Sequence, residues 1–94
     1  MNSKERAKLR SLAQTMPDLT HIGKNGYENS IEQIKEQLES RELVKIKVLK
    51  NCDLSAKDMA QTIAELTNSE VVQVMGEKIT LYKFSTKKGV EHVL

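Results

Sequence analysis

Apolar side chains recur three and four positions apart in three stretches of the chain, which is the spacing of one face of an α-helix. These stretches predict helices over Lys4–Met16 and Asn29–Arg41, and a third over Ser55–Thr67 in which Ser55 is the N-cap. Ser3 is suited to cap the first helix. Pro17 ends that helix, because the residue before a proline avoids the α region.

The segment 43–49 alternates between apolar and polar residues, which is the period of a β-strand. Its apolar residues fall on one face, and Lys45 and Lys47 fall on the other. Shorter apolar runs predict further strands, at 19–22, 71–75 and 79–84. Because only Gly76, Glu77 and Lys78 link the last two runs, these strands should form an antiparallel hairpin.

The predicted elements follow one another in the order αβαβαββ. Helical connections between strands favour parallel pairing with right-handed crossovers. We therefore expect an α/β fold, a two-layer sandwich on a mixed four-stranded sheet, in which the strand order is left open. The 94 residues should form one domain, with residues 85–94 as a loosely held tail.

Composition narrows the class of protein. With 38% hydrophobic and 30% charged residues, the sequence is typical of a globular protein. It has no apolar run long enough to span a membrane and no signal-peptide core near its start, which predicts a cytoplasmic protein without a membrane partner. Cys52 is the only cysteine, so it can form neither an internal disulfide nor a cysteine cluster, and we interpret it as a structural thiol.

The sequence carries no motif of an enzyme, a metal site or a cofactor site. We therefore expect a protein that is not an enzyme and holds no cofactor and no metal. His21 should be a surface or half-buried ring rather than a catalytic base. The alternative, a small-molecule enzyme, would require a deep pocket lined by His21, Cys52 and carboxylates.

Charge is segregated along the chain, although the net charge is only +2. Lys and Arg are in excess over residues 1–26, 43–50 and 71–94, whereas Asp and Glu are in excess over residues 27–42 and 51–70. Lysines occupy the solvated surface of most proteins. Their confinement to particular elements nevertheless favours a face that binds a polyanion.

A glycine-flanked loop, Gly23-Lys24-Asn25-Gly26, links the first predicted strand to the second predicted helix. Glycines allow positive φ and let another molecule approach the backbone closely. The N–H groups at a helix start attract phosphate, and Lys24 adds a full charge. The alternative is an ordinary Asn-Gly turn.

Three features, in this order, resemble the YhbY-like proteins, which are single CRM domains (chloroplast RNA splicing and ribosome maturation). They are the Gly23–Gly26 loop after the first strand, the second strand around Glu42–Val48, and Leu81-Tyr82-Lys83 in the last strand. The resemblance implies a fold similar to the C-terminal domain of translation initiation factor three. It also implies RNA binding through the loop and a basic surface. Bacterial members of the family are linked with precursors of the large ribosomal subunit.

We therefore expect an RNA-binding assembly factor that contacts ribosomal RNA in precursors of the large subunit. The candidate RNA-binding residues are Gly23, Lys24, Asn25, Gly26, Lys45, Lys47, Lys83, Arg6, Lys8 and Arg10. Tyr27 either stacks on a base or fills the core, and we favour the core. The alternative function is a protein-interaction module whose acidic second helix docks a basic ribosomal protein. The sequence leaves the oligomeric state open.

Overall fold

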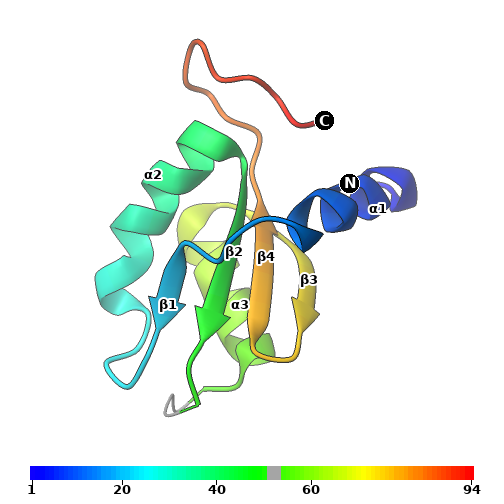
Figure 1. The fold of residues 1–94 in the computed structure, drawn as a ribbon. Helices are drawn as coiled ribbons and strands as arrows, with labels where there is room; N and C mark the ends of the chain where they lie inside the picture. The colour runs from blue at the N-terminus through cyan, green and yellow to red at the C-terminus, as the bar shows by residue number, and fades with distance from the viewer. Residues whose placement is uncertain (51–53) are drawn as a thin grey trace.

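The computed structural model describes residues 1–50 and 54–94, which form a four-stranded sheet flanked by helices (Figure 1). The turn expected at Asn51–Asp53, and with it Cys52, lies outside the described residues. A short 3₁₀ helix spans Glu28–Ser30. The other elements are α1 (Ser3–Gln14), β1 (Thr20–Ile22), α2 (Ile31–Arg41), β2 (Leu43–Val48), α3 (Ala56–Thr67), β3 (Glu70–Met75) and β4 (Lys78–Tyr82).

The sheet is mixed and has the strand order β1-β2-β4-β3. β1 and β2 pair in parallel, whereas β4 pairs antiparallel with both β2 and β3. The chain crosses through α3 to the far edge of the sheet and returns through the hairpin to fill the gap beside β2. The predicted fold class, an α/β sandwich on a mixed four-stranded sheet, is therefore confirmed.

The main core lies between the sheet and the two helices α2 and α3, which cover the same face (Figure 1). The alternation in β2 directs Val44, Ile46 and Val48 into this core, where all three are buried. Ile34 of α2 and Ile63 of α3 meet them from the helix side. Tyr27 is partly buried against the same cluster, so it lies where the core interpretation places it.

Helix α1 packs on the opposite face of the sheet and covers only part of it. Leu9 and Ala13 contact a second buried cluster that includes Leu43 and Tyr82. The N-cap of α1 is Asn2 rather than the predicted Ser3. Asn2 forms a reciprocal capping box with Glu5, whereas the residue at the equivalent distance from Ser3 is an arginine, which cannot accept the return hydrogen bond.

Because β1 and β2 are parallel, their carboxyl ends lie at the same end of the sheet, which we call the loop end. The Gly23–Gly26 loop leaves β1 there, and Lys50 follows β2. The two-residue turn Gly76-Glu77 of the β3–β4 hairpin lies beside them, because Glu77 O accepts a hydrogen bond from Val48 N. The loop end therefore gathers three connections that lie far apart in the sequence.

The C-terminal tail, which we expect to be loosely held, makes several hydrogen bonds to the domain. Ser85 N donates to a carboxylate oxygen of Glu42 at 2.6 Å, and Val93 N donates to the other at 2.8 Å. Glu39 accepts hydrogen bonds from the backbone and hydroxyl of Thr86. Two glutamates at the end of α2 therefore fasten the tail to the domain.

Candidate nucleic-acid interface

The Gly23–Gly26 loop is a tight turn that Gly26 closes. Gly26 N donates to Gly23 O at 2.9 Å, and Gly26 has a φ of 80°. Among the described residues, positive φ at glycine occurs at Gly26, Gly76 and Gly89, so only the second glycine of the loop uses this freedom. Apart from Gly26 and its two chain neighbours, no described residue has an atom within 4 Å of the position that a Cβ on Gly26 would take, which leaves the backbone open to an approaching ligand.

The helix after the loop begins later than predicted. The 3₁₀ helix Glu28–Ser30 stands between the loop and α2, whose N-cap, Ser30, makes no side-chain capping bond. Glu28 and Glu32 add negative charge in the first turns of these two helices. Attraction of a phosphate at this loop therefore depends on Lys24 and on the loop backbone more than on the dipole of α2.

A shallow hollow of about 290 Å³ adjoins the loop. Residues 24–28 form one side of it, and Leu54 and Met59, near the start of α3, form the other. The loop therefore projects beside the neighbouring helix rather than alone into solvent.

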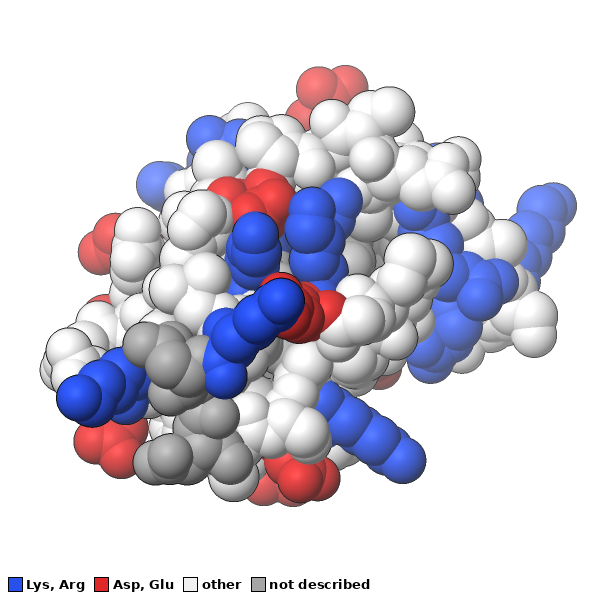
Figure 2. Space-filling view, turned by 60° about the horizontal axis from the view of Figure 1, so that its bottom comes forward, with Lys and Arg blue, Asp and Glu red and all other residues white. Residues whose placement is uncertain are grey.

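Two of the predicted lysines at the loop end carry uncompensated charge. Lys24 is exposed at the tip of the loop, and Lys47 is half-buried on β2. Within the described parts of the chain, neither side chain has a hydrogen bond or an ion pair. Figure 2, turned to bring the loop end forward, shows basic side chains across its centre with acidic ones between them.

Lys45, the other predicted lysine on β2, has a structural partner. Its Nζ donates to the carbonyl oxygen of Ala13 at 3.0 Å and to that of Met16 at 3.4 Å. These carbonyls lie at the C-terminal end of α1, where a positive charge is favourable. Lys45 thus fixes α1 on the sheet, which leaves its ammonium group less available to a ligand than that of Lys47.

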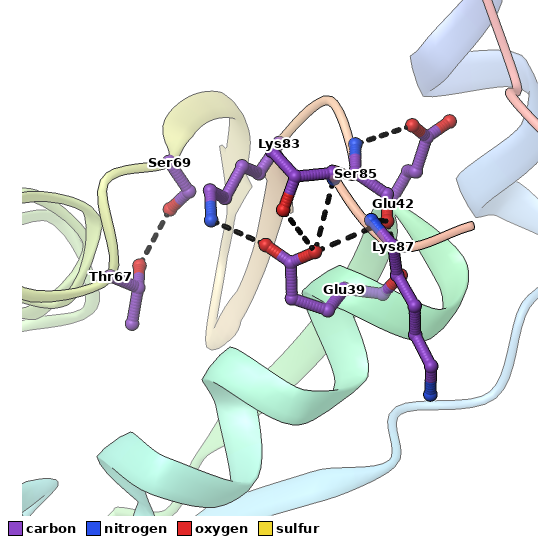
Figure 3. Close-up of polar contacts among 8 residues, drawn as sticks. Glu39, Glu42, Thr67, Ser69, Lys83, Ser85 and Lys87 are labelled. Atoms are coloured by element: carbon purple, nitrogen blue, oxygen red, sulfur yellow. Dashed lines mark hydrogen bonds and ion pairs between the residues drawn. The ribbon is translucent and has the colours of Figure 1, made fainter. Parts of the chain in front are cut away.

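Arg6 and Lys83 are also held by contacts within the domain. Arg6 donates to the carbonyl oxygens of Val71 and Val72 on the edge strand β3, at 2.9 and 2.8 Å. Lys83 lies 2.6 Å from Glu39 in an ion pair (Figure 3). Lys8 and Arg10 are exposed on α1, which covers the end of the sheet face that lies away from the loop. The structure therefore groups only Lys24 and Lys47 of the predicted cations around the loop end.

Sequence reasoning missed a basic residue beside Lys47. Lys78 opens β4, pairs directly with Lys47 across the β2–β4 ladder and has a 45% exposed side chain. His21 of β1 pairs with Lys47 from the other side and is exposed. The alternation of apolar and polar residues in β2 predicts the face that carries Lys47. The residues beside Lys47 on the adjacent strands follow only from the strand order.

Asp18 holds the two residues that flank Lys47. Its carboxylate accepts a hydrogen bond from His21 Nε2 at 2.7 Å and pairs with Lys78 Nζ at 3.4 Å. Partial burial raises the pKa of Asp18, but hydrogen bonds from His21, from the backbone and from Lys78 lower it, so that the pKa falls below its ordinary value. Asp18 therefore stays ionised and fixes both neighbours.

The acidic face of α2 is less open to a basic partner than its sequence implies. Glu42 is fully buried, and Glu39 is bound to Lys83 and the tail. The hydrogen bond from Lys83, followed by that from the Thr86 backbone, lowers the pKa of Glu39 to about 2. Glu28, Glu32 and Glu36 remain exposed. Two of the five acidic groups therefore have roles inside the domain.

Residues 1–50 and 54–94 contain no group of three or more His, Cys, Asp or Glu side chains placed to hold a metal ion. None of the helices in these ranges is long and apolar enough to cross a membrane.

Comparison with known proteins relates these features to a family. The CRS1/YhbY (CRM) domain model matches residues 1–83. The chain is 40% identical over 86 residues to "Probable RNA-binding protein YqeI" of Bacillus subtilis, with 90% of each chain covered. It is 33% identical over 85 residues to "Probable RNA-binding protein MJ0652" of Methanocaldococcus jannaschii, and this match covers 88% of the chain and 63% of the relative.

A solved structure agrees with the fold and with the sequence match. The solution structure of SAV1595 from Staphylococcus aureus superposes with a TM-score of 0.79 at 42% identity, and 97% of each chain is covered. The family match includes the loop and all four strands, because it extends to the residue after β4. The chain therefore belongs to the CRS1/YhbY (CRM) domain family.

Proposed function

We propose that this protein binds RNA through the Gly23–Gly26 loop and the basic residues beside it. The observation that carries the proposal is the combination of a CRM domain with two cations at the loop end, Lys24 and Lys47, that have no partner among the described residues. An RNA backbone needs positive charge and close access to main-chain N–H groups. The open side of Gly26 lets a phosphate approach the loop backbone closely, while Gly26 N itself donates to Gly23 O.

The RNA that we propose is ribosomal RNA in precursors of the large subunit, bound in the cytoplasm by a protein that acts as an assembly factor and not as an enzyme. The family resemblance supports this choice. The low aromatic content, 3%, favours recognition of RNA by shape and backbone over a broad base-stacking surface. Docking of a basic protein on α2 is less well supported, because Glu39 and Glu42 are engaged inside the domain.

Two experiments test the proposal. Sedimentation of a lysate at low salt should show the protein with large-subunit precursors more than with mature ribosomes; a profile containing only free protein would reject the assembly role. Binding to ribosomal RNA fragments should weaken steeply with salt. About four to six phosphate contacts give a log–log slope of about −3 to −4, whereas a slope near zero would reject electrostatic binding of the backbone.

A further inference from the structure

We propose that RNA bound at the loop continues across the open face of the sheet, where its phosphates contact Lys47 and Lys78. This inference rests on the proposed function and adds a second contact surface to it. The surface is the row of cross-strand neighbours His21, Lys47, Lys78 and Met75, which we call the sheet row.

The sheet row follows from the pairing register. Lys47 is opposite His21 on β1 and opposite Lys78 on β4, and Lys78 is opposite Met75 on β3. Side chains at paired positions project from the same face of a sheet. The row therefore crosses all four strands on one face, opposite to the face that α2 and α3 cover.

The row is left uncovered because α1 packs further along the same face. The α1 contacts include Leu43 and Tyr82, which pair with each other four positions before Lys47 on β2 and four after Lys78 on β4. Lys45 lies between the Leu43–Tyr82 pair and the sheet row, and its hydrogen bond to Ala13 O holds the C-terminal end of α1 against the sheet. Met75 at the far end of the row is 67% exposed, so the surface is open from β1 to β3.

Part of the charge of the row is held in place by an ion pair. Asp18 binds both His21 and Lys78, which restrains these flanking side chains while Lys47 between them has no partner among the described residues. A restrained cation loses less side-chain entropy when it binds a phosphate. The two lysines outweigh the single carboxylate, so the row has a net positive charge at neutral pH.

The ligand chemistry that suits the row is the sugar–phosphate backbone, not a particular base. Lysine ammonium groups act as point charges, and the row offers no planar side chain for stacking other than His21, which is tied to Asp18. β1 leads directly into the Gly23–Gly26 loop, so the row begins beside the loop. One RNA strand can thus contact Lys24 and then the row.

A gain of affinity provides the sharpest test, because it cannot arise from unfolding. Met75→Lys adds a lysine to the row, and Leu66→Lys adds one at a 48% exposed position of α3, on the other side of the sheet. Both variants change the net charge equally. With an oligouridylate and an oligoadenylate of equal length as probes, Met75→Lys should bind both about three- to tenfold more tightly, with a salt slope steeper by about 1. Leu66→Lys should bind as the wild type does.

The matching loss is Lys78→Gln, with Lys35→Gln on α2 as its control. Lys78→Gln should weaken binding to both probes by a similar factor and make the salt slope shallower, whereas Lys35→Gln should not. The proposal that RNA contacts the sheet row would be wrong if Met75→Lys and Leu66→Lys changed the affinity equally. It would also be wrong if Lys78→Gln and Lys35→Gln did so. If Lys24→Glu still weakened binding in that case, the loop proposal would stand without the row. Failure of the wild type to bind either probe at low salt would overturn both.

Discussion

The buried carboxylate of Glu42 lies 2.6 Å from Nδ1 of His92, 50 residues further along the chain. The same carboxylate accepts hydrogen bonds from the backbone of Ser85 and Val93 (Figure 3 shows the Ser85 contact). The ring of His92 stacks on Phe84 with 4.1 Å between ring centroids. Glu42 itself has a φ of 65°, a conformation that is rare outside glycine and that persists only where surrounding contacts maintain it.

Glu42→Gln should therefore destabilise the domain. Gln keeps the shape of the side chain but loses the negative charge, and its NH₂ group cannot accept a hydrogen bond from the donors that now meet the carboxylate. We expect the free energy of unfolding in urea to fall by about 1–3 kcal/mol. Glu36→Gln, at an exposed position of α2, is the control and should stay within about 0.5 kcal/mol of the wild type. Equal stabilities of the two variants would contradict the structural role of Glu42.

Acid should weaken the fold through Glu39. The folded-state pKa of Glu39 is about 2, below the ordinary value of 4.5, so the unfolded chain binds more protons between these values. The stability that Glu39 contributes is complete above pH 4.5 and is lost as the pH falls toward about 2. Glu42 adds an effect of the same sign: burial raises its pKa, but hydrogen bonds from Ser85, His92 and Val93 lower it below the ordinary value.

Lys83→Gln tests this assignment, because the hydrogen bond from Lys83 is the largest cause of the lowered pKa of Glu39. The melting temperature of this variant should decline less steeply than that of the wild type as the pH is lowered. Lys35→Gln, which removes the partner of the exposed Glu32, is the control and should follow the wild-type curve. A decline as steep in Lys83→Gln as in the wild type would contradict the role of the ion pair.

The fold could be predicted from the sequence where the signal is local. The alternation of β2 places Val44 and Ile46 in the core, and Ser55 caps α3 as predicted, with its side chain accepting from Asp58 N. The strand order could not be predicted, because the insertion of β4 between β2 and β3 depends on contacts between distant segments. The N-cap of α1 could have been predicted, since Asn2 and Glu5 have the capping-box spacing in the sequence.

The candidate site could likewise be predicted from the sequence only in part. The sequence identifies Lys45 and Lys83 as basic but not their partners, which are carbonyls of α1 and a carboxylate of α2. A count of charges therefore overestimates the free cations. Nor does the sequence show that Lys78 lies beside Lys47, a position that it takes through the pairing of β4 with β2. The partner of a charged side chain depends on tertiary packing, and no periodic pattern in the sequence records it.

Lys45 and Lys47 should accordingly behave differently although both project from the same face of β2. Lys45→Met keeps the aliphatic stem but removes the charge at the end of α1, so we expect a loss of about 0.5–1 kcal/mol in unfolding free energy. Lys47→Met should leave the melting temperature near the wild-type value and weaken RNA binding. Urea titration together with RNA affinity at fixed salt separates the two effects. If only Lys45→Met weakened RNA binding, Lys45 and not Lys47 would be the residue that contacts RNA.

The loop is tested by reversing its charge. Lys24→Glu should weaken binding to ribosomal RNA fragments by about 1–2 kcal/mol or more, because attraction to a phosphate is replaced by repulsion. Lys24 is exposed and lies outside the positive-φ positions, so the melting temperature should stay near that of the wild type. Gly26→Asp would be harder to interpret, because a non-glycine residue at a φ of 80° also costs about 1 kcal/mol of stability.

Lys57→Glu is the matched control, because it makes the same change of charge at an exposed position in the first turn of α3. If the loop contacts a phosphate, only Lys24→Glu should lose affinity at fixed salt, and its salt slope should become shallower. Equal losses at both positions would show that RNA responds to the net charge of the domain. The Gly23–Gly26 loop would then be an ordinary turn between β1 and α2.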